Sequence, residues 1–182
     1  AVFDADEGRM TVVQRALVRF PLADDSAEAT EPTNLKPAGL AAPFTIAAAM
    51  VRDEGGSLHA RHHFNGKIDG PLLFSAALPI ERLERLARDP RAALAEKDLV
   101  AAWDFAREIP TIRVVDLGPN RLDGACINLP ARAMKGWRWT GEEMNWMRRP
   151  EHYGAIHFHE DDLYDCGWTP DFAWTVPPGT RS

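Results

Sequence analysis

The chain lacks most of the features that mark membrane, secreted or nucleic-acid-binding proteins. Its 182 residues include two cysteines, too few for the disulfide framework of a small secreted domain. No apolar run approaches the roughly 20 residues that span a bilayer. The 21 basic residues are outnumbered by 27 acidic ones, and a net charge of −6 argues against a platform that binds nucleic acid through bulk positive charge. We therefore expect a soluble, cytoplasmic chain without a nucleic-acid or membrane partner.

The pattern of apolar residues favours short strands over helices. Apolar residues make up 45% of the chain, enough for a buried core in one large or two small domains of roughly 100 to 200 residues. One stretch, residues 79–97, has helical spacing, and Asp89-Pro90 interrupts it. Strands are expected at residues 10–20, 44–51, 58–64, 67–74, 99–105, 111–117, 122–129, 155–159 and 172–176, with a surface loop at 23–43.

These elements predict a mainly β fold, an antiparallel β-sandwich with one short helix and an irregular C-terminal extension. We expect the sandwich domain to occupy residues 1–130. Residues 131–182 would form a tryptophan-rich loop and C-terminal strands that lead toward a catalytic region elsewhere. Within the sandwich, Asn65-Gly66 is the dipeptide best suited to a two-residue hairpin turn, because both central positions of such a turn need positive φ.

Several segments carry a family resemblance. His62 to Leu78 (HHFNGKIDGPLLFSAAL) resembles the closing hairpin of laminin-G-like or concanavalin-like sandwiches. The segments LVAAWDFA, VVDLGPNRLDGACINLPARAMKGWRWTG, RRPEHYGAIHFHEDDLYDCGW and DFAWTVP resemble consecutive parts of the large subunit of the N,N-dimethylformamidase family. The resemblance runs from about Phe44 to the C-terminus and is most specific over residues 153–168.

This resemblance implies part of a hydrolase that cleaves the C–N bond of a small amide. It also implies a mononuclear iron held by two tyrosines and a glutamate in a later part of that subunit, so no ligand is transferred to this chain. The partners would be other chains of the same enzyme in a hetero-oligomer. The family pattern continues past the point where this chain ends at Ser182, and cleavage of a precursor there is one hypothesis.

Three residues near the C-terminus are the candidate metal ligands. His157, His159 and Asp161 are spaced at i, i+2 and i+4, so a continuous strand would place them on one face. Imidazole and carboxylate ligate zinc, iron or manganese. The alternative is a hydrogen-bonded polar cluster, and the acidic run 160–162 would also suit calcium.

The remaining reactive residues have weaker patterns. His59 and His63 would share a strand face, with no third ligand nearby. Cys126 lies in an apolar segment typical of a small buried side chain, and the acidic neighbour of Cys166 disfavours a reactive thiolate. Neither a nucleophile elbow nor a phosphate-binding glycine loop is present.

The segment 132–149 combines tryptophans and methionines with five basic residues, and the stretch 150–171 carries six acidic residues and no basic one. This composition suits a subunit interface or a sugar-stacking platform. The alternatives to a part of an amide hydrolase are therefore a lectin-like carbohydrate-binding sandwich, with calcium, and a small metallohydrolase.

Overall fold

The protein is described from a computed structural model, which covers residues 2–4, 9–15, 26–32, 43–159, 169, 172–175 and 177–179. Its elements in chain order are β1 (Val2–Asp4), β2 (Arg9–Arg15), β3 (Ser26–Pro32), β4 (Ala49–Arg52), β5 (Leu58–Arg61), β6 (Gly66–Asp69), β7 (Leu72–Phe74), α1 (Ile80–Arg88), the 3₁₀ helix η1 (Pro90–Ala95), β8 (Leu99–Asp104), β9 (Arg113–Asp116), β10 (Gly124–Ala125), β11 (Ala131–Met134), the 3₁₀ helix η2 (Pro150–Tyr153) and β12 (Ala155–Phe158). The described residues contain no helix with the length and apolarity needed to cross a bilayer.

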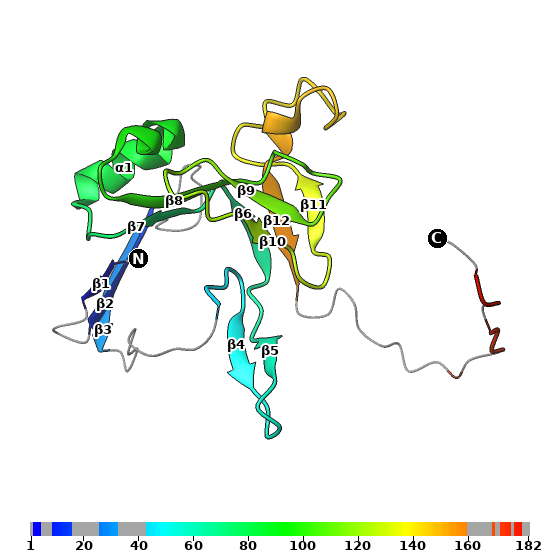
Figure 1. Cartoon of the computed structure of the whole chain (residues 1–182). Helices are drawn as coiled ribbons and strands as arrows, with labels where there is room; N and C mark the ends of the chain where they lie inside the picture. The colour runs from blue at the N-terminus through cyan, green and yellow to red at the C-terminus, as the bar shows by residue number, and fades with distance from the viewer. Residues whose placement is uncertain are drawn as a thin grey trace.

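All strand pairs in the described part of the chain are antiparallel. The strands form four small sheets, ordered β1-β2-β3, β4-β5, β10-β9-β8-β7 and β11-β12-β6. The predicted mainly β fold with one short α-helix is therefore confirmed, and its antiparallel sheets are consistent with a sandwich-like arrangement (Figure 1). Because β6 pairs with β12, one sheet joins the segments that we assigned to residues 1–130 and 131–182.

The core consists of two apolar clusters that share strand β8. Helix α1 packs Leu86 and Leu83 against the first cluster, together with Leu99 of β8. The second cluster gathers buried side chains from β8, β9 and β12: Ala101, Trp103, Phe105, Val114 and Ile156. Figure 1 shows α1 beside β7 and β8, with β6, β11 and β12 toward the other end of the same body. Four of the six residues of β8 are buried: Leu99 and Ala102 belong to the first cluster, and Ala101 and Trp103 belong to the second.

The predicted helical stretch is confirmed, including its interruption. Asp89 ends α1, its backbone N–H donating to the Arg85 carbonyl, and Pro90 starts η1. Proline suits this first position because it lacks the N–H that the start of a helix leaves unpaired. The Glu96 carboxylate at the end of η1 pairs with Arg82 and, at 2.6 Å, with Arg85 of α1. This pairing ties the two helical turns together.

Two polar side chains, the buried Asp116 and the half-buried Arg132, fix the loops around β8 and β9. The Asp116 carboxylate is fully buried and accepts backbone N–H groups of Ala102, Gly118 and Leu122 at 2.7–2.8 Å. The Arg132 guanidinium donates to five backbone carbonyls of the preceding loop, at Phe105, Arg107, Glu108, Thr111 and Arg113. A short side-chain network thus replaces regular strand pairing in this loop.

The predicted hairpin at Asn65-Gly66 is wrong. Strand β5 pairs with β4, and β6 pairs with β12. The turn that closes the β4–β5 hairpin lies at Asp53 to Ser57, where the Asp53 carboxylate accepts the Ser57 N–H at 2.8 Å and Gly56 adopts φ +84°. Strand β5 ends just before His62, at φ +55°, and Gly66 is already the first residue of β6. The hairpin in this region is therefore β4–β5, whose turn is closed by the Asp53 side chain, and no hairpin turns at Asn65-Gly66.

Other boundaries also differ from the sequence-based expectation. Residues 172–175 form no strand, and Phe172 and Trp174 are largely exposed. Within the predicted loop 23–43, strand β3 pairs with β2 over seven residues. The predicted strands 44–51 and 122–129 shorten to β4 and β10, and β11 was not predicted. Strands β3, β4 and β10 each pair with a neighbour in the chain, so their bounds follow that pairing and not the local apolar pattern.

Candidate functional site

A hollow lined by charged side chains surrounds Asp69, the last residue of β6. Two glycines make room for its carboxylate: a Cβ on Gly136 would overlap Oδ2, and one on Gly154 would lie 3.0 Å from Oδ1. The Trp137 backbone N–H donates to Oδ2 at 3.0 Å. Burial raises the pKa of Asp69 above its ordinary value, although the Trp137 hydrogen bond and the nearby Arg138 charge oppose that rise. The fold therefore holds a half-buried carboxyl group in a fixed position.

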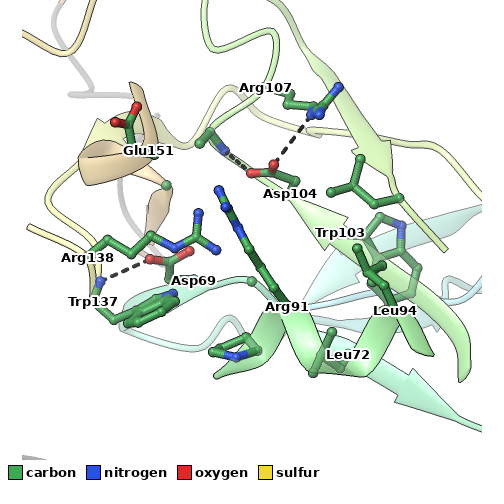
Figure 2. A pocket seen from close by; sticks show the side chains of 16 residues that line it. Asp69, Leu72, Arg91, Leu94, Trp103, Asp104, Arg107, Trp137, Arg138 and Glu151 are labelled. Atoms are coloured by element: carbon green, nitrogen blue, oxygen red, sulfur yellow. Dashed lines mark hydrogen bonds and ion pairs between the residues drawn. The ribbon is translucent and has the colours of Figure 1, made fainter. Parts of the chain in front are cut away.

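A pocket of about 380 Å³, which we call the Asp69 pocket, opens beside this carboxylate. Figure 2 shows its polar side chains: Asp69, Arg91, Asp104, Arg107, Arg138 and Glu151. Its apolar wall includes Leu72, Leu94 and the ring of Trp103. The pocket thus offers charges of both signs next to an apolar surface.

Two of the three acidic groups have nearby basic partners. The Asp104 carboxylate accepts the Ala106 N–H at 3.0 Å and lies 3.4 Å from Nε of Arg107. The Glu151 carboxylate lies 3.4 Å from Arg149, and the pKa of Glu151 is lowered, first by its own backbone N–H and then by Arg149. These pairs neutralise much of the negative charge around the pocket.

The two remaining guanidinium groups are placed differently. In Figure 2 the Arg91 side chain rises from η1 into the space between Asp69 and Asp104, and the Arg138 guanidinium lies beside Asp69. Within the described part of the chain, neither group forms an ion pair within 4 Å or a hydrogen bond. Arg138 instead stacks over the Trp137 ring, 4.8 Å from its centroid. Two positive groups therefore face the pocket without a carboxylate bound directly to either.

The predicted metal candidates are only partly described. His157 lies in β12 and His159 just beyond it, with Nε2 of His159 2.9 Å from Nδ1 of His157 and ring centroids 3.7 Å apart. Asp161 lies outside the described residues, as do the other acidic residues of the run 160–162. Among the side chains that are described, no group of three histidine, cysteine or acidic residues is arranged to hold a metal ion. Because Asp161 is not described, the metal site and the polar cluster both stay predictions.

The other candidate histidines do not act together. His59 is bound at 2.8 Å to Asp53, whose pKa is lowered mainly by this hydrogen bond. His63 lies beyond β5 and lines a separate groove, where its Nδ1 is buried and lacks a hydrogen-bond partner. The expected shared strand face is therefore not formed.

That groove, which we call the apolar groove, has a volume of about 550 Å³ and extends along the second core cluster. Its lining includes Phe44, Ile46, His63, Trp103, Cys126, Ile127, Ile156 and Phe158. Phe44 stacks on Trp103 with ring centroids 5.8 Å apart, yet 66% of Phe44 and 59% of Ile127 are exposed. The described chain leaves this largely apolar lining open.

Cys126 has the environment of a packing residue. It is half-buried against the second core cluster, and burial raises the pKa of its thiol while the Arg132 charge opposes that rise. A raised pKa reduces the thiolate fraction at neutral pH, so the structure gives no sign of a nucleophile here. Cys166 lies outside the described residues.

The tryptophan-rich segment places two of its five basic residues on its own aromatic rings. Lys135 Nζ lies 4.0 Å from the Trp139 ring centroid, in addition to the Arg138 contact with Trp137. Met144 and Met147 are 70% and 69% exposed. The exposed methionines agree with an interface composition, and the cation-occupied rings offer less open face for a stacked sugar.

Sequence inspection did not identify Asp69, Arg91 or Arg138 as site residues. A carboxylate at the end of an apolar strand, directly before Gly70-Pro71, was the available signal for Asp69. The two arginines come from η1 and from the loop after β11, and no sequence spacing relates them. Their proximity results from tertiary packing.

The chain was compared with known proteins. No family model matches it. It is 35% identical over 196 aligned positions to the N,N-dimethylformamidase beta subunit of Alcaligenes sp., an alignment that covers 100% of this chain and 25% of that protein. It is 43% identical over 125 positions to the N,N-dimethylformamidase beta subunit of Paracoccus aminophilus, covering 66% of this chain and 16% of that protein. The chain thus spans about a quarter of the length of the curated relatives that it matches, and its similarity to the Alcaligenes protein extends over the whole chain.

Proposed function

We propose that this chain is a segment of the large subunit of a dimethylformamidase-like hydrolase, which cleaves the C–N bond of a small amide. The observation that carries the proposal is the similarity to two dimethylformamidase beta subunits, which in one case extends over the whole chain. Because those relatives are about four times as long, we assign the chemistry to the remainder of the subunit. This segment would cover that catalytic region and contact other chains of the assembly.

An iron centre, which the family resemblance implies, does not fit the residues described here. The chain has two tyrosines, Tyr153 and Tyr164. Tyr153 is buried and its hydroxyl donates to the Glu143 carbonyl at 2.7 Å, and Tyr164 lies outside the described residues. The described part cannot supply a pair of tyrosine ligands, so we derive no catalytic step through iron here and place the metal in the rest of the enzyme.

The apolar groove supports a packing role. Single exposed apolar side chains are common on protein surfaces, but several around one hollow indicate a contact surface. Here Phe44, Ile127 and Leu122 of the groove lining are 66%, 59% and 47% exposed. We propose that the remainder of the same subunit covers this groove.

Two finer assignments remain proposals. The sandwich is proposed to be laminin-G-like, and His157, His159 and Asp161 would bind a metal ion if Asp161 completed the set. The lectin-like alternative, with its calcium, is not favoured by the comparisons, since both relatives are amidase subunits by name.

A matched pair of substitutions tests this proposal in the complete enzyme. Ile127→Asp places a charge in the apolar groove, and Ile112→Asp places one at another exposed isoleucine, 53% exposed and outside the groove. Burying an isoleucine contributes about 1.5–3 kcal/mol, so Ile127→Asp should weaken association of the segment by roughly 10- to 150-fold.

We expect Ile127→Asp to reduce both the mass of the assembly, measured by native mass spectrometry, and the release of dimethylamine from N,N-dimethylformamide. Ile112→Asp should leave both unchanged. If the two variants assemble and hydrolyse the amide equally well, the groove is not the contact surface. If the wild-type enzyme releases no amine from any small amide, the proposed hydrolase activity is wrong.

A further inference from the structure

The unpaired arginines of the Asp69 pocket carry an inference that goes beyond the packing role. Arg91 and Arg138 both reach the pocket, and neither has a carboxylate within ion-pair distance among the described residues. Two like charges directed at one hollow repel each other unless an anion lies between them. We propose that the Asp69 pocket binds a small monocarboxylate that carries an apolar group.

The charge of the pocket favours one negative charge on the ligand. Asp104 is paired with Arg107, and Glu151 is paired with Arg149 outside the pocket. The remaining three groups, Asp69, Arg91 and Arg138, sum to one positive charge when all are ionised. A monoanion neutralises this set, whereas a phosphate dianion would leave an excess of negative charge beside three carboxylates.

The geometry of the donors also favours a carboxylate. A guanidinium group presents parallel N–H donors that match the two oxygens of a carboxylate.

The apolar walls of the pocket are the reason to expect an apolar group on the ligand. Leu72, Leu94 and Trp103 line the side opposite Asp69 and Arg138 (Figure 2). Beyond Leu72 the pocket adjoins a second hollow of about 620 Å³, bordered by Phe74, Leu83 and Leu86. A ligand anchored at the arginines would therefore direct its tail toward apolar side chains, where its burial is favourable.

This inference rests on the pocket and does not require the proposed amide hydrolysis. If both hold, they are related by chemistry: hydrolysis of an amide adds water across the C–N bond and yields a carboxylic acid and an amine. The acid product would share the carboxylate that the pocket takes, but formate, the acid from N,N-dimethylformamide, has no apolar group, so the proposed ligand is a larger acid. Binding and hydrolysis are measured separately, so failure of one does not imply failure of the other.

Isothermal titration calorimetry of the purified enzyme at pH 7 and low salt tests the inference with three probes. Benzoate has the proposed chemistry, benzamide is its neutral counterpart of similar shape, and inorganic phosphate is the competing anion. We expect benzoate to bind at least about tenfold more tightly than either, since charge-assisted hydrogen bonds contribute about 1.5–3 kcal/mol each and tenfold corresponds to about 1.4 kcal/mol.

Substitutions then locate the site. Arg91→Gln and Arg138→Gln should each weaken benzoate binding about tenfold, while Arg148→Gln, at an exposed arginine outside the pocket, should leave it within twofold. Asp69→Asn should tighten benzoate binding, because it removes the negative charge nearest the ligand. Thermal unfolding of each variant checks that the fold is retained.

Several results would overturn the proposal. Failure of benzoate to bind the wild-type enzyme would do so without any variant. If benzamide binds as tightly as benzoate, the charge of the ligand does not contribute to binding. If phosphate binds more tightly than benzoate, the ligand is not a carboxylate. Undiminished benzoate binding by both Arg91→Gln and Arg138→Gln would place the ligand elsewhere.

Discussion

Replacing Arg132 with methionine should destabilise the fold more than any other change at a surface arginine of the described chain. Two guanidinium nitrogens of Arg132 serve five acceptors, the backbone carbonyls of Phe105, Arg107, Glu108, Thr111 and Arg113, at 2.6–3.1 Å. These contacts hold the loop between β8 and β9 against β11. Methionine keeps most of the apolar stem but removes every donor.

The expected loss follows from the number of charged donors. A hydrogen bond to a charged group contributes about 1.5–3 kcal/mol net. Most of the five carbonyls lie in an exposed loop and would regain water, so we count the two donor nitrogens at the lower end of this range and expect a loss of about 3 kcal/mol. For a chain of this size, that corresponds to a fall in melting temperature of about 6–12 °C.

The assay is urea and thermal unfolding followed by circular dichroism. Arg132→Met is compared with Arg148→Met, which removes one exposed ion pair at 3.6 Å and should cost less than about 0.5 kcal/mol. Arg132→Lys retains one charged nitrogen and should recover part of the loss. An unfolding free energy for Arg132→Met equal to that of Arg148→Met would refute the role assigned to the guanidinium.

Three further predictions concern the site. Gly136→Ala should lower the melting temperature, since its Cβ would overlap the Asp69 carboxylate. Adding Asp69→Ala should restore part of this loss. If the double variant melts no higher than Gly136→Ala alone, the loss does not come from the overlap with Asp69. The folded chain holds the Asp69 proton more tightly than the unfolded chain, whose pKa is near 3.8, so stability falls as pH rises through the raised pKa. Asp69→Asn removes this loss, and its unfolding free energy relative to wild type should increase between pH 4 and 7; a decrease would contradict the sign of the shift. If His157 and His159 are metal ligands, alanine at either should lower the metal content measured by plasma mass spectrometry, and unchanged content would leave them as a hydrogen-bonded pair.

Local signals in the sequence were sufficient for some elements. The helix α1 and its break were predictable because proline at position 90 cannot continue an α-helix and suits the start of η1. Strand β8 was predictable from a buried apolar run, LVAAWD, bounded by polar residues. In both cases neighbouring residues determine the structure.

Pairing between distant segments could not be predicted in the same way. The Asn65-Gly66 dipeptide has the right chemistry for a hairpin, but β6 is paired with β12, nearly ninety positions along the chain. The same limit applies to the Asp69 pocket. Its arginines come from η1 and from the loop after β11; the glycine at 136 lets the second of these segments approach Asp69, and tertiary packing brings η1 to the same pocket.

The most direct test of the account is whether this segment is needed for amide hydrolysis. The rest of the enzyme, prepared without the segment, is assayed for dimethylamine release from N,N-dimethylformamide before and after the purified 182-residue chain is added. We predict little or no activity without the segment and recovery when it is added, with weaker recovery by the Ile127→Asp variant. Full activity without the segment, or no activity in the complete wild-type enzyme, would contradict the account.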